Sequence, residues 1–369
     1  MKTLKFMCAA LVAAVALAGC QKEDSGKDNG SKQPKSITIS LSNVKVPAKS
    51  LQNQVQNGTT AKVNTYQVFF ANAAGTAFYE GLAADGTAVE HFITVNDPAT
   101  DLTKTFHFVD PAVEQVLIIA NFDTEQTFAT VTDLKAAAVT VASQQNVDKL
   151  ILFGEDTALT SLSEDHSSEH QASNVYKAEV EIAPLVARLE VVNFSTDFGT
   201  NPAFESVTVN KIAFNDYYTT AHLSGAVEAR ENTEIDAANV YTYLGSLNGT
   251  SWAYDNLTAV MTPLAETATF ADNKVYAYNF FPVAGTTGTE EGYPQLIIGA
   301  SALDKQGNTV QQYLDTESFN GVTAPGFEPG KVYRVQFAFS VDNLENQLKC
   351  VEVTVTVKEW TVVSVTPNV

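Results

Sequence analysis

Cysteine, arginine and long apolar runs are all scarce in this sequence of 369 residues. Its three cysteines, Cys8, Cys20 and Cys350, are too few and too scattered for a disulfide framework. No apolar run reaches the roughly 20 residues that a membrane-spanning helix needs. The 22 Lys and Arg residues are outnumbered by 42 Asp and Glu, and the formal net charge is −20. So acidic a chain argues against nucleic acid and anionic lipid head groups as partners.

Sequence motifs for catalysis, phosphate binding and metal binding are also missing. There is no Gly-x-Ser-x-Gly elbow, no phosphate-binding glycine loop and no Cys-x-x-Cys pair. The segment 166–170 matches His-x-x-Glu-His, but its Ser-rich and acidic surroundings lack the helical period that such a zinc site requires. His107 lies between two phenylalanines, so strand alternation predicts that it points away from the core. We therefore expect no cofactor, no metal and no enzymatic activity.

The first twenty residues have the pattern of an export signal. Two lysines precede a short apolar run that ends in Leu17-Ala18-Gly19-Cys20. This ending resembles a bacterial lipobox, in which the cysteine receives acyl chains, palmitate among them, and becomes the new N-terminus. We expect residues 1–19 to be the signal peptide and Cys20 to carry lipid. Residues 20–35 are polar and charged, which predicts a flexible tether.

The remainder is typical of an all-β protein. Short runs of β-branched and aromatic residues recur between turn residues, and convincing helices are few. One short helix is predicted from Leu134 toward Val147. Pro184 interrupts two strand-like pieces, and proline is poorly tolerated inside a central strand. We predict two tandem antiparallel β-sandwich domains of transthyretin-like or Greek-key type, over residues 36–184 and 185–369.

The first predicted strand is Ser36–Ser42, in which apolar and hydroxyl residues alternate. Because successive side chains of a strand point to opposite faces, Ile37, Ile39 and Leu41 should share one buried face. A polar stretch with Lys45 and Lys49 follows and ends the strand pattern.

Several segments, in this order, resemble the fimbrillin family, the subunits of type V pili in Bacteroidales. The first strand followed by a basic site resembles the fimbrillin propeptide. Residues 113–121 resemble the family's strand ending in Ala-Asn, and residues 182–191 resemble the Pro…Ala-Arg segment before its second domain. Residues 354–360 resemble its C-terminal strand, with a Trp near the end.

The resemblance implies an assembly mechanism. A surface protease of basic specificity removes the first strand, here residues 36–49 with the plug Ile37, Ile39 and Leu41. In the best-known members the processing site is an arginine, but the first arginine of this chain is Arg188. The cut would therefore follow Lys49 or Lys45. Lys49 is favoured, because Pro47 lies so close after Lys45.

The resemblance also implies that a C-terminal strand of another subunit refills the groove, as strand addition to an open edge. The candidate donor lies within residues 351–369, in one of two sets: Val351, Val353, Val355 and Val357, or Trp360 with Val362, Val363 and Val365. The implied partners are other pilus subunits, of the same or another kind, a host or bacterial surface receptor, and the outer membrane through the lipid. The implied location is the cell surface, in a fimbrium.

Two alternatives share the same signal and fold. The chain could remain uncut and act as a lipid-held anchor subunit of the pilus. It could also be a surface lipoprotein that binds glycans, which should show a cluster of exposed Trp and Tyr; only Trp252 and Trp360 are present as tryptophans.

Overall fold

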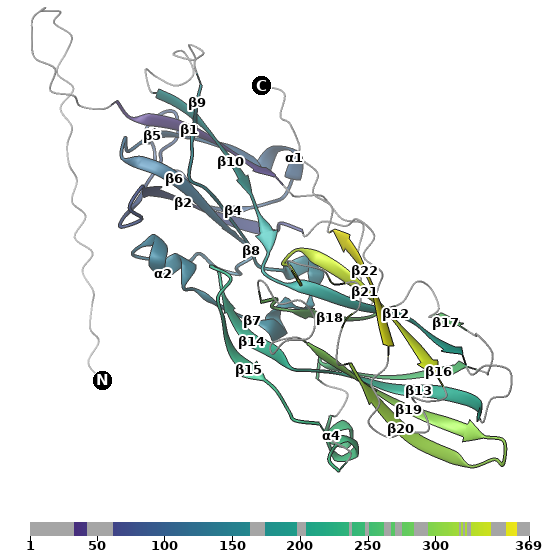
Figure 1. Ribbon diagram of the computed structural model, residues 1–369. Helices are drawn as coiled ribbons and strands as arrows, with labels where there is room; N and C mark the ends of the chain where they lie inside the picture. Colours follow the sequence, from purple (N-terminus) through teal and green to yellow (C-terminus); the bar gives the residue numbers. More distant parts are fainter. Residues whose placement is uncertain are drawn as a thin grey trace, which may run out of the picture. The chain divides into compact units, whose positions relative to one another are not determined.

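The structure is a computed structural model of the chain. It describes residues 33–42, 62–162, 174–197, 204–235, 238–247, 251–261, 267–269, 275–283, 294–316, 319, 322, 326–340 and 352–359. Strands dominate these residues, and the predicted all-β fold is confirmed (Figure 1). None of the helices in these ranges is both long and apolar enough to cross a membrane.

Two sheets form from the N-terminal part of the chain. One sheet has the order β5-β1-β10-β9. The other has the order β11-β8-β6-β2-β3, with β4 also paired to β2. Their strands are β1 (Lys35–Ser42), β2 (Thr65–Asn72), β3 (Phe78–Tyr79), β4 (Phe92–Thr94), β5 (Thr103–Val109), β6 (Val113–Ala120), β8 (Leu152–Asp156), β9 (Thr160–Ser161), β10 (Asn174–Glu181) and β11 (Ala183–Pro184).

Two further sheets form from the C-terminal part. One has the order β17-β12-β21-β22, with β18 also paired to β12, and the other has the order β16-β13-β19-β20. Their strands are β12 (Ala187–Asp197), β13 (Phe204–Asn215), β16 (Tyr254–Met261), β17 (Thr267–Thr269), β18 (Tyr276–Phe280), β19 (Gln295–Asp304), β20 (Thr309–Asp315), β21 (Lys331–Ser340) and β22 (Glu352–Glu359). Helix α4 (Val240–Ser246) precedes β16 in the chain.

Among the described strands, pairing is antiparallel except at two places. β1 runs parallel to β10, and β12 runs parallel to β21. Each of these first strands also has antiparallel neighbours, β5 for β1 and β17 and β18 for β12. A parallel pair needs a long crossover and leaves no hairpin signal in the sequence, so alternation alone predicted antiparallel pairing throughout.

The predicted helix from Leu134 toward Val147 is wrong as a single element. α1 (Pro98–Asp101) and α2 (Val131–Lys135) are short, and α2 is followed by β7 (Ala138–Thr140) and by the 3-10 turns η1 (Val141–Gln145) and η2 (Val147–Lys149). β7 pairs with β14 (Tyr217–His222), which also pairs with β15 (Val227–Glu231). Pairing with a distant strand thus overrides the helix propensity of the alanine-rich segment.

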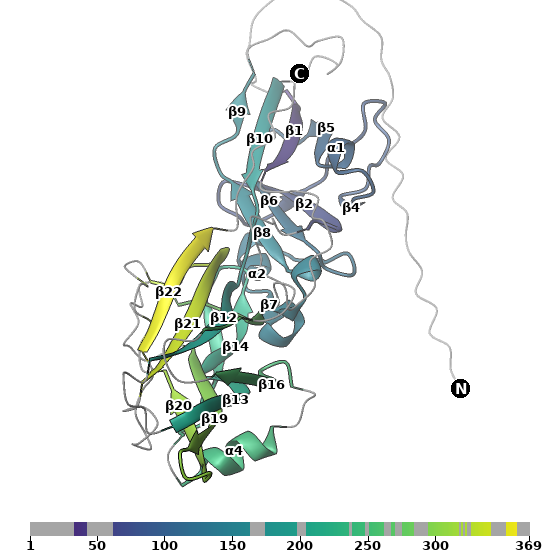
Figure 2. The same cartoon turned by 90° about the vertical axis from the view of Figure 1, so that its right-hand side faces the viewer.

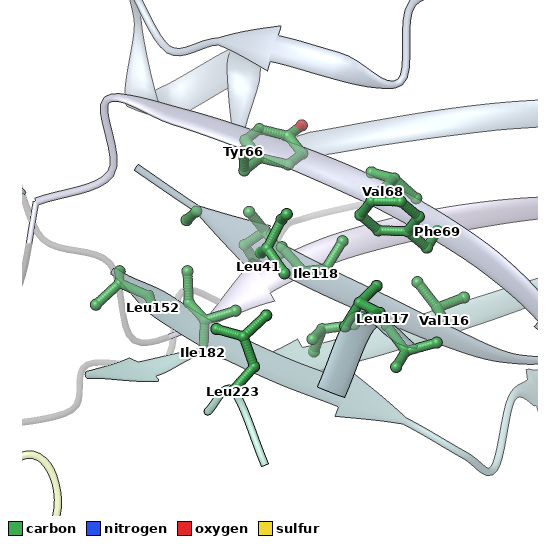
Figure 3. Packing of buried hydrophobic residues seen from close by; sticks show 14 of the residues in the cluster. Leu41, Tyr66, Val68, Phe69, Val116, Leu117, Ile118, Leu152, Ile182 and Leu223 are labelled. Carbon is green, nitrogen blue, oxygen red and sulfur yellow. The ribbon is translucent and has the colours of Figure 1, made fainter. Parts of the chain in front are cut away.

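Buried side chains gather in two large clusters. The first takes residues from β1, β2, β6 and β10, and includes Leu223 and Phe281 from later in the chain. The second lies among β12, β13, β19 and β21. Figure 3 shows part of the first cluster, with Leu41 of β1 among Ile118, Leu152 and Ile182. β7 pairs with β14, and Phe281 belongs to the first cluster, so residues on both sides of position 184 are in contact. The division of the chain into two domains at residue 184 stays a prediction.

Candidate functional site

The candidate site is the slot that β1 fills between β5 and β10 (Figures 1 and 2). All eight residues of β1 pair with β10, from Lys35 opposite Asn174 to Ser42 opposite Glu181. On its other side β1 pairs with β5, and the Leu41 N–H donates to the Leu102 carbonyl at 3.0 Å. The segment predicted as the propeptide strand is therefore a central strand with neighbours on both sides.

The inner face of β1 is apolar and closed to solvent. Ile37, Ile39 and Leu41 are only 0%, 1% and 5% exposed, and all three belong to the first core cluster. Burying a side chain of this size contributes about 1.5–3 kcal/mol. Three such side chains make β1 part of the core, so its departure would open an apolar groove.

The opposite face of β1 carries hydroxyl groups. Ser36 Oγ lies 3.2 Å from His107 Nδ1, and Thr38 Oγ1 lies 2.9 Å from Thr105 Oγ1. Ser40 Oγ is buried and has no hydrogen-bond partner in the part of the chain that the structure describes. A buried hydroxyl without a partner costs about 1–3 kcal/mol. The strand therefore combines apolar burial on one face with an imperfect polar match on the other.

His107 lies beside Ser36, on the face opposite Ile37 and Phe106, as strand alternation predicts, but it is buried, with 9% exposure. A bulge in β5 follows it. Phe108 has a φ of 54°, and the pairing with β1 shifts between Lys35 and Ile37. An extra residue in one strand changes the alternation beyond it, so Val109 is buried in the core cluster as Phe106 is.

Chain connectivity makes β1 separable. It is the first described strand, and both its neighbours come later in the chain. One cut between Ser42 and Lys62 would therefore detach β1 and leave every other described element covalently joined. The predicted cut sites Lys45 and Lys49, and the predicted lipidation site Cys20, lie outside the described residues.

Arg188 is an unsuitable processing site in the folded chain. It is 1% exposed and lies in β12, where its Nε donates to Glu190 Oε1 at 2.9 Å. Burial lowers the pKa of the Arg188 guanidinium, and the Glu190 carboxylate opposes that shift. Glu190 also accepts from Arg334 Nε at 3.3 Å. A protease needs an accessible basic side chain, and this one is held by a buried ion pair.

Polar contacts of β18 extend this network beyond its sheet. Asn279 Oδ1 lies 3.4 Å from an Arg188 guanidinium nitrogen. The Asn279 backbone N–H donates to Gln145 Oε1 at 3.0 Å, and Gln145 Nε2 donates to the Asn279 carbonyl at 2.8 Å. The glutamine side chain of η1 thus pairs with a strand backbone as another strand would, joining η1 to β18.

The candidate donor residues fall partly within the described chain. Val353, Val355 and Val357 lie in β22, which pairs antiparallel with β21 from Glu352 opposite Ala338 to Glu359 opposite Lys331. Among the described strands, β22 has β21 as its only partner and forms the edge of its sheet (Figure 2). Val351, Trp360, Val362, Val363 and Val365 lie outside the described residues.

Among the described residues, few features fit a zinc site or a glycan-binding surface. The His-x-x-Glu-His segment lies outside the described residues, and within those residues no group of three His, Cys, Asp or Glu could hold a metal. A hollow of about 430 Å³ beside β2 is lined partly by aromatic rings. Phe69 there packs on Phe78 and Phe128, with ring centres 5.2 and 5.7 Å apart. Trp252 packs on Tyr217 at 4.9 Å. These rings contact one another, unlike free stacking platforms.

Residues that face β1 from β5 were not found from the sequence. Thr105 and His107 lie in a run, Thr103–Val109, whose alternation marks a strand but not its neighbour. The Gln145–Asn279 contact was missed for the same reason, since the two residues are far apart in sequence. Only a pairing prediction between distant segments could have identified them.

Comparison with known proteins gives one family and one fold. Residues 36–184 match the model of the family described as major fimbrial subunit protein (FimA). That family consists of fimbrial structural subunits and is not a family of enzymes. No curated protein sequence matches the chain.

Solved structures share the fold over most of the chain. A fimbrilin (fimA) from Porphyromonas gingivalis W83 is 14% identical with a TM-score of 0.55, and the alignment covers 90% of this chain and 99% of that one. A putative cell adhesion protein from Bacteroides eggerthii DSM 20697 is 17% identical with a TM-score of 0.53, covering 91% of this chain and 98% of that one. The predicted resemblance to the fimbrillins is therefore confirmed, by the family model over residues 36–184 and by a fold shared over nine-tenths of the chain.

Proposed function

We propose that this chain is a structural and adhesive subunit of a cell-surface pilus that assembles by exchanging β1 for a C-terminal strand of another subunit. The observation that carries the proposal is the position of β1: a buried central strand that one cut in the following segment would detach. The slot it leaves would present two unpaired strand edges, β5 and β10, above an apolar floor. Such a groove is a template for an incoming strand.

The difference in strand neighbours favours exchange. In its own subunit β22 pairs with one described strand, β21. In the vacated slot the same segment would pair with two, and its valines would replace the apolar side chains of β1. Each backbone hydrogen bond gained contributes about 0.5–1.5 kcal/mol, and each buried Val side chain about 1.5–3 kcal/mol. The exchange gains contacts only after β1 has left, so the uncut subunit stays a monomer.

Export and processing complete the proposal. The chain is carried to the outer membrane as a lipoprotein with acyl groups on Cys20, and a surface protease then cuts after Lys49. Lys45 is the second choice, because Val46-Pro47 follows it. The buried ion pair of Arg188 supports a lysine site, since it makes the first arginine of the chain inaccessible.

An uncut anchor subunit is the second candidate function. It is favoured by the lack of any arginine before Arg188, because an arginine-specific protease would leave the N-terminal region intact. In that form lipid, tether and β1 would remain one chain, and the subunit would hold a pilus at the membrane. It would donate a strand and accept none.

N-terminal sequencing of the cell-surface form, with its oligomeric state, separates these functions. A stalk subunit should begin at Ser50, or at Val46, and should form oligomers. An anchor should begin at lipidated Cys20. A surface form that begins at Ser50 and remains monomeric would contradict assembly by strand exchange.

A further inference from the structure

The amino-acid pattern of β1 occurs a second time in the chain, in β22. In β1 three apolar residues alternate with hydroxyl residues, as Ile37-Thr38-Ile39-Ser40-Leu41. In β22 the run Val353-Thr354-Val355-Thr356-Val357 has the same alternation and length. β1, which fills the slot, and β22, the last described strand, therefore share one pattern.

The slot has matching requirements at four of these positions. Its floor takes the three apolar side chains of β1, which are at most 5% exposed. On the opposite face Thr105 Oγ1 lies 2.9 Å from Thr38 Oγ1. An incoming strand can fill the slot if it has apolar residues at three alternate positions and a hydroxyl opposite Thr105. β22 supplies both, and its β-branched residues are suited to a sheet.

The other candidate donor meets this requirement less well. In the last ten residues the alternation gives Val363-Ser364-Val365-Thr366 and then reaches Pro367. Proline has no N–H to donate and is poorly tolerated in a central strand. The third apolar position would thus be lost, and with it a ladder hydrogen bond.

The pattern of β22 reads nearly the same in both directions, so its direction must come from the flanking residues. If β22 enters in the direction of β1, Glu352 takes the place of Ser36, whose Oγ is 3.2 Å from His107 Nδ1. In the reverse direction Lys358 takes that buried place. A carboxylate can accept a hydrogen bond from the imidazole and is attracted to its protonated form, whereas an ammonium group is repelled by it.

We infer that β22 of a second copy enters the slot in the direction of β1, with Thr354 opposite Thr105 and Thr356 opposite Thr103. This inference rests on the proposed strand exchange and adds the identity, register and direction of the donor. The incoming strand would run parallel to β10 and antiparallel to β5, as β1 does. Thr105 is then a specificity residue that aligns the donor.

Site-specific disulfide formation tests this register. The background is the chain from Gln21 with Cys350→Ser, which contains no cysteine. A site for a sequence-specific protease after Lys49 lets the chain fold with β1 in place before it is cut. The cut acceptor carries Thr105→Cys and is mixed with an uncut donor carrying Thr354→Cys or Thr356→Cys. Directly opposed residues of antiparallel strands lie about 4.5–5.5 Å apart between Cα atoms, within the range for a disulfide.

We expect a disulfide-linked pair with Thr354→Cys and at least tenfold less with Thr356→Cys. Thr356→Cys should instead link to an acceptor with Thr103→Cys. Preferential linkage of Thr356→Cys to Thr105→Cys would overturn the direction. Light scattering before oxidation shows whether complexes form. Complexes that form but give none of these disulfides would overturn β22 as the donor while leaving strand exchange intact. If no complex forms between cut acceptor and donor, the proposed function fails, and the register with it.

Discussion

β1 and β12 occupy equivalent places in their sheets but are held in different ways. Each is a central strand with one parallel neighbour, β10 for β1 and β21 for β12, and antiparallel neighbours on the other side. β12 continues directly from β11 and contains a buried ion pair with links to β18. β1 carries a buried hydroxyl, that of Ser40, without a partner among the described residues, and is followed by the predicted cut sites. The same position thus serves as a permanent core strand in one region and, as we propose, a removable one in the other.

The largest expected loss of stability comes from a substitution in β12. Glu190→Leu would leave Arg188 charged and buried beside Asn279, and an uncompensated buried charge costs about 3–5 kcal/mol. Urea unfolding of the uncut chain should show this loss. The double variant Arg188→Met with Glu190→Leu should recover most of it, because an apolar pair can replace a buried ion pair. A double variant as unstable as the single one would show that the ion pair is not the cause.

The second largest loss of stability comes from a substitution in β1. Ile39→Ala removes a side chain that is 1% exposed and should destabilise the uncut chain by about 2–5 kcal/mol. After cutting, β1 should also dissociate faster, as measured by loss of its peptide on size-exclusion chromatography. Val310→Ala, at an edge position 36% exposed, is the matched control and should change neither quantity measurably. Equal peptide loss from the wild type and Ile39→Ala would contradict the plug role of this side chain.

A smaller pair of effects should have opposite signs within β1. Ser36→Ala removes a hydroxyl paired with His107 and should destabilise the chain by about 1 kcal/mol. Ser40→Ala removes a buried hydroxyl without a described partner and should stabilise it by about 1 kcal/mol. Denaturant midpoints of the two variants check the signs. Destabilisation by Ser40→Ala would show that its hydroxyl has a partner after all.

The smallest effect concerns pH and the contact between α2 and β14. Hydrogen bonding to the Ala136 carbonyl, and then to Glu228, raises the pKa of His222 above its ordinary value of 6.5. A raised folded-state pKa gives stability that is present in full below the unfolded pKa and is lost as pH rises through the folded one. The stability difference between wild type and His222→Gln should therefore shrink from about pH 5.5 to about pH 8.5. A difference that grows with pH would contradict this.

Local pattern predicted the strands, and distant pairing decided the site. The alternation of Ile37, Ile39 and Leu41 was enough to predict a strand with one apolar face. It could not show that β10 is a parallel neighbour, because such pairing leaves no mark near either strand. The bulge at Phe108, which brings Val109 onto the same buried face as Phe106, depends on the pairing with β1 and was equally invisible. The fold class was therefore predictable, and the residues that face the slot were not.

The composition of assembled fibres tests the central claim most directly. The chain from Gln21, cut after Lys49 once folded, would be allowed to polymerise, and the fibres would be washed and analysed by mass spectrometry for the peptide that contains residues 35–42. The account predicts polymers that have lost this peptide at nearly every subunit, while the uncut chain remains monomeric. Polymers that retain one β1 peptide per subunit would mean that the subunits join elsewhere, and would contradict the exchange of β1 for a strand of a neighbour.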